Sequence, residues 1–175
     1  HGNIRSILAL QQIKPDELKK LPEVVKRVNA VKMHRLKSSK KATRQLSDTP
    51  TLYEYGFIPK SPFLLIPETS SEKREYVPVA YMKPPVIPSN KIMIIPNAGI
   101  ELFGLLSSKM HMIWMDLVGG KLGTSFSYSS GMVYNTFPIP DDILDDLKSF
   151  AQKILDIREN YKKSTLSDLY DPIMM

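Results

Sequence analysis

The 175-residue chain contains no cysteine, which excludes disulfide bonds and metal sites built on thiolates. Its three histidines, His1, His34 and His111, lie far apart in the sequence, so no paired-histidine metal motif is present. No apolar run approaches the roughly 18 residues that a membrane-spanning helix requires, and no signal-peptide pattern opens the chain. These absences predict a cytoplasmic protein with no bound metal and no membrane partner.

The motifs of an autonomous enzyme are absent as well. The sequence has no Gly-x-Ser-x-Gly elbow, no phosphate-binding loop and no dinucleotide fingerprint. His111 lies between Met110 and Met112 in an apolar stretch, which is typical of a buried structural histidine rather than of a general base. We therefore predict that these 175 residues contain no catalytic residue.

The distribution of charge is the first feature that indicates a partner, because the basic residues are concentrated in the first third of the chain. Residues 1–49 hold twelve Lys/Arg and four Asp/Glu, a net of +8; residues 50–140 hold seven and six, a net of +1; residues 141–175 hold five and eight, a net of −3. This asymmetry is typical of proteins with a polyanionic partner, most often nucleic acid. On charge alone, a basic helix face that is simply solvated explains it equally well. The same boundaries predict a basic helical segment, a central core and a C-terminal helical arm.

The pattern of apolar residues predicts an α+β fold, with a small, mixed, twisted sheet flanked by helices. Short β-rich runs bounded by Pro, Ser and Asn predict strands at residues 63–66, 76–82, 92–95, 126–128 and 133–137. Proline followed by acidic residues predicts helices that begin at Pro15 and Pro22. Apolar patterning predicts a helix over 102–118 with a break at 107–108 and a tail helix over 141–163.

Two stretches are predicted to contact phosphate. The helix that begins at Pro22 leads into a turn where positive charges and hydroxyl groups coincide. The contacts predicted there are Arg35, Lys37, Ser38, Lys40, Lys41 and Arg44. Residues 121–130 form a second stretch, flexible and rich in hydroxyls, which can follow a nucleic-acid backbone or be a plain hairpin connection. Its predicted contacts are Lys121, Ser125, Tyr128 and Ser129.

A third stretch, residues 70–76, is predicted to read bases. Small hydroxyls can donate to phosphates, while Arg and Glu carry the groups that read guanine and cytosine edges in the major groove. The residues assigned to base reading are Ser70, Ser71, Glu72 and Arg74. The alternative for this stretch is a capped turn with a surface ion pair.

Seven blocks in a fixed order cover nearly the whole chain. The first three are Lys20-Leu21-Pro22-Glu23-Val24-Val25-Lys26-Arg27-Val28, Arg35-Leu36-Lys37-Ser38 and Ser70-Ser71-Glu72-Lys73-Arg74-Glu75-Tyr76. The others are residues 107–115, residues 128–129, Val133-Tyr134-Asn135-Thr136-Phe137-Pro138 and Asp168-Leu169-Tyr170-Asp171-Pro172. This ordered set resembles the target recognition region of the large MmeI-type DNA methyltransferases of bacterial restriction–modification systems. The chain departs from the family pattern at two places. At Asp116 the relatives tend to have a basic residue, and where this chain has Gly119-Gly120-Lys121-Leu122 they usually have Cys and Arg.

The resemblance implies a role in methyl transfer from S-adenosylmethionine to adenine N6, with or without an endonuclease activity in the full-length protein. This chain would grip double-stranded DNA and read its bases while the methyltransferase domain of the same polypeptide flips the adenine. Neither the catalytic Asn-Pro-Pro-aromatic motif nor the cofactor-binding loop of such enzymes lies in these residues, so no cofactor is expected to bind here. The abrupt ends of the chain also suggest a part of a larger protein.

Two alternative functions remain open. The basic helix and the amphipathic tail over residues 143–161 would equally suit a protein-docking module. An RNA-binding domain is the third possibility, and it is disfavoured because the stacking-aromatic signatures of the common RNA modules are absent. Steep salt dependence of duplex-DNA binding distinguishes recognition of DNA from docking, and competition with structured RNA distinguishes DNA from RNA.

Overall fold

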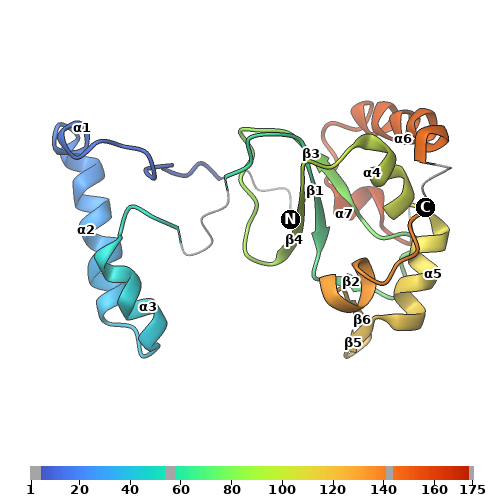
Figure 1. The fold of residues 1–175 in the computed structure, drawn as a ribbon, viewed down its shortest axis with the longest axis horizontal. Coiled ribbons are helices and arrows are strands. Elements are labelled where there is room, and N and C mark those ends of the chain that lie inside the picture. Colours follow the sequence, from blue (N-terminus) through green and yellow to red (C-terminus); the bar gives the residue numbers. More distant parts are fainter. Residues whose placement is uncertain (1–4, 54–57, 141–143, 174–175) are drawn as a thin grey trace. The chain divides into compact units, whose positions relative to one another are not determined.

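The fold is described by a computed structural model, which covers residues 5–53, 58–140 and 144–173 (Figure 1). The chain divides into two compact units at the boundary between residues 57 and 58. We call the first of them the helical unit and the second, which includes the C-terminal helices, the α+β unit.

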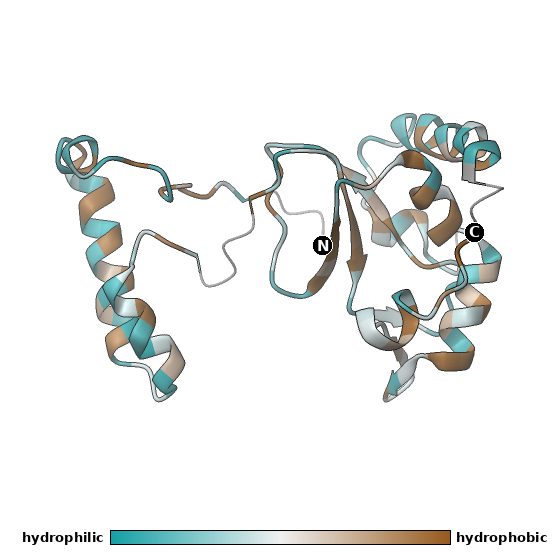
Figure 2. Ribbon diagram, in the orientation of Figure 1, coloured by the Kyte–Doolittle hydropathy of each residue, from teal (hydrophilic) through white to brown (hydrophobic). Residues whose placement is uncertain are grey.

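The helical unit contains α1 (Pro15–Lys19), α2 (Pro22–Leu36), α3 (Lys41–Gln45) and the 3₁₀ turn η1 (Leu46–Asp48). Both α1 and α2 begin with proline, whose fixed φ and missing N–H suit the first helical position, and both carry acids in the first turn. The predicted helix starts at Pro15 and Pro22 are therefore confirmed. Hydrophilic and hydrophobic residues alternate along α2 (Figure 2), and most of this helix is exposed or half-buried.

The first sheet of the α+β unit is antiparallel and has three strands. Its central strand β1 (Phe63–Pro67) pairs with β3 (Ala80–Met82) on one side and with β4 (Ile92–Pro96) on the other. Both β1 and β4 end in proline, a residue that cannot donate to the ladder and is tolerated at strand ends.

A second antiparallel sheet has the order β2-β6-β5, formed by β2 (Thr69–Ser71), β6 (Ser125–Ser127) and β5 (Gly120–Leu122). Glu68 lies between the sheets: its N–H donates to the Lys91 carbonyl (3.4 Å), and its own carbonyl accepts from the Tyr128 N–H (2.8 Å). The chain therefore leaves the first sheet after β1 and enters the second at once. The α+β class is confirmed, but two antiparallel sheets replace the single mixed sheet that we expected.

Two of the predicted strands differ from the structure. Of residues 76–82, Ala80–Met82 alone pair as a strand. Residues 133–137 were wrongly predicted as a strand, because the chain forms the π-helical turn η2 (Ser130–Tyr134) there. Tertiary contacts hold this turn: the Trp114 indole N–H donates to the carbonyl of Val133 at 3.2 Å.

Helices complete the α+β unit. The predicted break at 107–108 is confirmed, since α4 (Ile100–Leu106) and α5 (Lys109–Val118) are separate and the Ser108 hydroxyl caps α5 by accepting from the His111 N–H at 3.2 Å. The predicted tail helix is α6 (Leu144–Glu159), with residues 141–143 outside the described part of the chain. The short helix α7 (Leu166–Leu169) follows.

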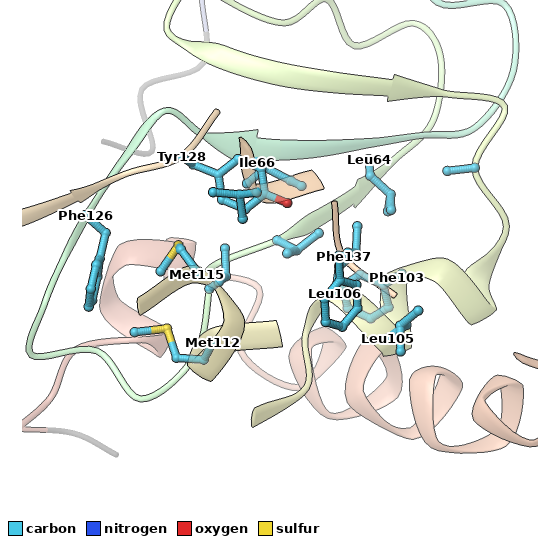
Figure 3. Packing of buried hydrophobic residues seen from close by; sticks show 14 of the residues in the cluster. Leu64, Ile66, Phe103, Leu105, Leu106, Met112, Met115, Phe126, Tyr128 and Phe137 are labelled. Atoms are coloured by element: carbon cyan, nitrogen blue, oxygen red, sulfur yellow. The ribbon is translucent and has the colours of Figure 1, made fainter. Parts of the chain in front are cut away.

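The core of the α+β unit is built between the first sheet and helices α4 and α5 (Figure 3). Its members include Leu64, Ile66, Phe103, Leu106, Met115 and Phe137. On the other side of α4, helix α6 packs so closely that a Cβ at Gly104 would lie 3.0 Å from the Ala151 Cβ. Glycine at this position therefore permits the close approach of α6 to α4.

His111 is fully buried in this core, which confirms the prediction of a buried histidine. Its Nε2 lies 2.9 Å from the Tyr128 hydroxyl, and the Phe137 ring packs edge-on against the imidazole with the ring centroids 4.6 Å apart. Burial lowers the pKa of His111 to about 4, so the imidazole is neutral at physiological pH. Burial, with a smaller contribution from Tyr134, raises the pKa of Tyr128.

Candidate nucleic-acid interface

Two classes of site find no support in the described residues. None of the described helices is long and apolar enough to cross a membrane. Across residues 5–53, 58–140 and 144–173, no group of three or more His, Asp or Glu side chains is placed to hold a metal ion.

Exposed lysines follow the end of α2 in the helical unit. Lys37, Lys40 and Lys41 are all exposed. Within the described part of the chain, no acidic side chain forms an ion pair with any of the three. Flexible ammonium groups that have no acidic partner are well suited to neutralise phosphates.

Arg35 has a structural role that the sequence did not reveal. It is half-buried, and its guanidinium donates to the carbonyls of Leu46 (2.8 Å), Thr49 (2.9 Å) and Leu52 (2.7 Å). These charge-assisted bonds fasten the segment after α3 to the end of α2. The arrangement directs the donors of Arg35 into the helical unit rather than toward a phosphate.

Arg44 is used in a similar way. Its Nη1 donates to the carbonyls of both Ser38 and Ser39 at 2.8 Å, which fixes the turn between α2 and α3. The Ser38 hydroxyl accepts from the Lys40 N–H at 3.2 Å. Both residues thus shape the turn that presents the lysines, and the exposed Arg44 retains donors that can still face solvent.

The stretch predicted to read bases divides into inward and outward side chains. Ser70 is buried, and Arg74 donates to its hydroxyl (3.3 Å), to the Tyr170 carbonyl (3.2 Å) and to the Ser167 hydroxyl (3.1 Å). We correct the expectation for Ser70 and Arg74, because these contacts tie the turn to the C-terminal helices. Of the other two predicted residues, Ser71 is half-buried and Glu72 is exposed.

The second sheet brings two of the predicted contact stretches together. Strand β2, from the base-reading stretch, pairs with β6, from the hydroxyl-rich loop, so that Ser70 lies opposite Phe126 and both are buried. Side chains alternate across a strand, and the neighbours of this buried pair therefore lie on the other face. We call this outer set the hydroxyl face; it consists of Thr69, Ser71, Ser125 and Ser127.

Lys121 lies on the opposite side of the β5–β6 hairpin from the hydroxyl face. It pairs in register with Phe126, its ammonium lies 3.7 Å from the centroid of that ring, and it donates to Asp116 at 3.1 Å. Asp116, which departs from the family pattern, thus serves as the partner of Lys121. The hairpin turns through Gly123, whose φ of 60° lies in the left-handed region that favours glycine.

Tyr128 is not presented to a nucleic acid as we expected, whereas Ser129 is exposed and stays a predicted contact. Tyr128 is 5% exposed and its hydroxyl lies against His111, so we correct the predicted phosphate contact. The Ser129 hydroxyl caps η2 by accepting from the Met132 N–H at 3.1 Å, although this residue is exposed. Conversely, Thr69 and Ser127 were not among the contacts predicted from the sequence, although they lie on the hydroxyl face. Their alternation with buried neighbours indicates an outward position only once the pairing of β2 with β6 is known.

Two family models together match the whole chain. The family model described as "MmeI, target recognition domain" matches residues 1–141, and the model described as "MmeI, C-terminal domain" matches residues 139–175. The chain belongs to the MmeI family. The boundary between the two MmeI segments falls near the start of the C-terminal helical arm.

Two relatives support the assignment to the MmeI family. A Bacillus subtilis (strain 168) protein named DNA methyltransferase A is 36% identical over 178 residues, which covers 100% of this chain and 20% of that protein. The solved structure of the type IIL restriction-modification enzyme MmeI in complex with DNA has 42% sequence identity and a TM-score of 0.85, covering 95% of this chain and 23% of that one. The chain therefore spans about a fifth of the length of these relatives.

Proposed function

We propose that this chain is the DNA sequence-recognition part of an S-adenosylmethionine-dependent adenine-N6 DNA methyltransferase of a restriction–modification system. The observation that carries the proposal is the second sheet, which combines two separately predicted contact stretches into one surface. Membership of the MmeI family and the DNA-bound structure of a relative support it.

The parts of the proposed interface differ in their chemistry. The side chains of the hydroxyl face are small, so a duplex can approach the sheet closely, and each hydroxyl can donate to a phosphate oxygen. Glu72, exposed in the turn after β2, would accept from a cytosine amino group in the major groove. Lys37, Lys40 and Lys41 would supply contacts to phosphate that do not depend on sequence.

Methyl transfer itself is assigned to the remainder of the polypeptide. S-adenosylmethionine supplies the methyl group in such enzymes, and residues 1–175 carry neither the Asn-Pro-Pro-aromatic motif nor a cofactor-binding loop. The role proposed for this chain is to hold the duplex in register while the target base is extruded.

Replacing Lys37, Lys40 and Lys41 with alanine is expected to weaken binding to every duplex alike. Each lost phosphate contact removes about one released counterion, so the slope of log affinity against log salt should become shallower by about three. A fluorescence-anisotropy titration of random duplex DNA at several salt concentrations measures this slope. Arg35 is left unchanged, because its removal would perturb the fold.

The matched control removes the same charge from the acidic C-terminal arm. Replacing Lys153, Lys162 and Lys163, which are all exposed, should leave the salt slope close to that of the unaltered protein. Equal changes in the two triple variants would mean that net charge alone governs binding, and the proposed location of the phosphate contacts would then be abandoned.

A Glu72→Ala substitution in the full-length protein is expected to relax recognition at one position of the target site. Loss of one direct base contact should reduce discrimination at that position by about 1–3 kcal/mol. Sequencing the adenines methylated in a randomised DNA library measures the change. Glu75→Ala is the matched control, since Glu75 is exposed and pairs with Lys109 at 3.9 Å. An unchanged target logo for Glu72→Ala would exclude base reading by this residue.

A further inference from the structure

A groove of about 760 Å³ lies beside α6 and α7 in the α+β unit. Three stretches distant in the sequence meet there: the turn after β2, the end of α4 and the C-terminal helices. Its lining includes Tyr76, Ser107, Ile157, Tyr161, Asp168 and Tyr170. The DNA contacts proposed above use none of these side chains.

Ser107 carries an unused hydrogen-bonding group in this groove. The residue ends α4 and is 7% exposed. Its Oγ is buried, and no described atom of the protein hydrogen-bonds to it. A buried hydroxyl without a partner is uncommon in a folded protein, because its desolvation is not compensated. Its position in the lining of the groove points to an occupant with a complementary polar group.

The walls of the groove are held rigidly. Arg158 donates to the Val79 carbonyl at 2.9 Å and to the Tyr170 hydroxyl, and its guanidinium lies 4.9 Å from the centroid of the Phe103 ring. Arg74 holds the same residue from its backbone side, by donating to the Tyr170 carbonyl at 3.2 Å. The groove therefore exists before any occupant arrives, which reduces the entropy lost on binding.

The groove is lined by exposed apolar side chains and by two carboxylates, with Arg158 as a basic residue in the same lining. Ile157 and Tyr161 line it and are 59% and 54% exposed, although both have large apolar surfaces. Asp168 and Asp171 also line it, and among the described residues neither forms an ion pair with a base. Each carboxylate accepts one backbone N–H, from Thr165 and Ile173 respectively, and keeps further lone pairs for a partner. Exposed apolar side chains favour a protein partner, and the carboxylates favour a basic one over DNA.

We propose that this groove binds a short segment from the remainder of the same polypeptide, in which an apolar side chain is flanked by a basic residue. This inference rests on the proposed function, because it requires the chain to be part of a longer methyltransferase. The relatives are about five times longer than the matched region. A tethered segment is present at high effective concentration, which favours it over a separate molecule.

Thiol labelling in the full-length polypeptide tests the proposal. Residues 1–175 contain no cysteine, so Ile157→Cys introduces a unique thiol in this region. Phe150→Cys is the matched control, because Phe150 lies on the same helix, is 60% exposed and does not line the groove. The rate at which N-ethylmaleimide modifies each thiol is measured by mass spectrometry of the labelled peptide and divided by the rate for the same variant unfolded in urea. The normalised rate for Ile157→Cys should be at least about tenfold lower than that for Phe150→Cys.

Three outcomes would overturn the proposal. Equal normalised rates would show that the groove is open. Protection that grows with protein concentration would assign the groove to a second copy of the chain, and protection that requires duplex DNA would assign it to DNA.

In a second experiment, a p-benzoylphenylalanine residue in place of Tyr161 should cross-link to a peptide of the same polypeptide outside residues 1–175. Neither experiment depends on the salt slope of DNA binding, so the two proposals can fail separately.

Discussion

Arg35→Ala is expected to lower the free energy of unfolding of the helical unit by about 2–3 kcal/mol. The substitution removes three charge-assisted hydrogen bonds and leaves the carbonyls of Leu46, Thr49 and Leu52 without their donor. Few other side chains of this unit are buried, and among its described residues these are Val28 and Ser47. Little other packing is therefore available to compensate for the loss.

Hydrogen–deuterium exchange measures this effect locally, because the two compact units can open independently. Amides from α2 through residue 52 should exchange faster in Arg35→Ala, while those of the α+β unit stay unchanged. Lys37→Ala is the matched control, since it removes the same charge two residues later without breaking a hydrogen bond in the structure. Arg35→Lys should resemble Arg35→Ala, because one ammonium cannot reproduce the planar fork. Exchange identical to that of the unaltered protein would contradict the assigned role.

The α+β unit is expected to lose about 3 kcal/mol of stability between pH 6.5 and pH 4 through His111. In the unfolded chain the imidazole takes up a proton near its ordinary pKa of about 6.5, whereas burial in the folded protein lowers that pKa to about 4. Between these values the unfolded state binds more protons, so acidification favours unfolding. The contribution of His111 to stability is complete above pH 6.5, falls as the pH is lowered, and changes no further below about pH 4.

His111→Gln provides the comparison, because an amide can still meet the Tyr128 hydroxyl but does not titrate in this range. Urea unfolding at intervals between pH 4.5 and 7.5, followed by the fluorescence of Trp114, reports on the α+β unit that contains both residues. The unaltered protein should show a steeper rise of stability with pH than the variant, whatever their difference at neutral pH. Parallel pH profiles would show that the imidazole is accessible to protons in the folded state.

Several features of the fold could be predicted because they depend on residues close together in the sequence. The starts of α1 and α2 follow from proline at the first helical position. The break between α4 and α5 follows from the local hydrogen bond of Ser108 to the His111 N–H. The turn η2 was not predicted in this way: besides the local cap from Ser129, its Val133 carbonyl accepts from Trp114, 19 residues away.

The candidate site was only partly predictable for the same reason. Ser70 and Ser71 are the same residue type, and the pairing of β2 with β6 decides that the first is buried and the second contributes to the hydroxyl face. A shift of one residue in that register would exchange their faces. Composition and spacing identified the polar stretch, but they carried no information about which of its side chains faces outward.

The sequence by itself determined that thiolate and disulfide chemistry are excluded, that positive charge is concentrated in residues 1–49, and that the ordered motifs are those of the MmeI family. The tertiary structure alone decided which cations remain available to a phosphate. Arg35 and Arg74 donate to groups up to 17 and 96 residues away, whereas Lys37, Lys40 and Lys41 remain exposed. Such bonds form only where folding brings distant carbonyls and hydroxyls within about 3 Å of a guanidinium, a condition that local sequence does not encode.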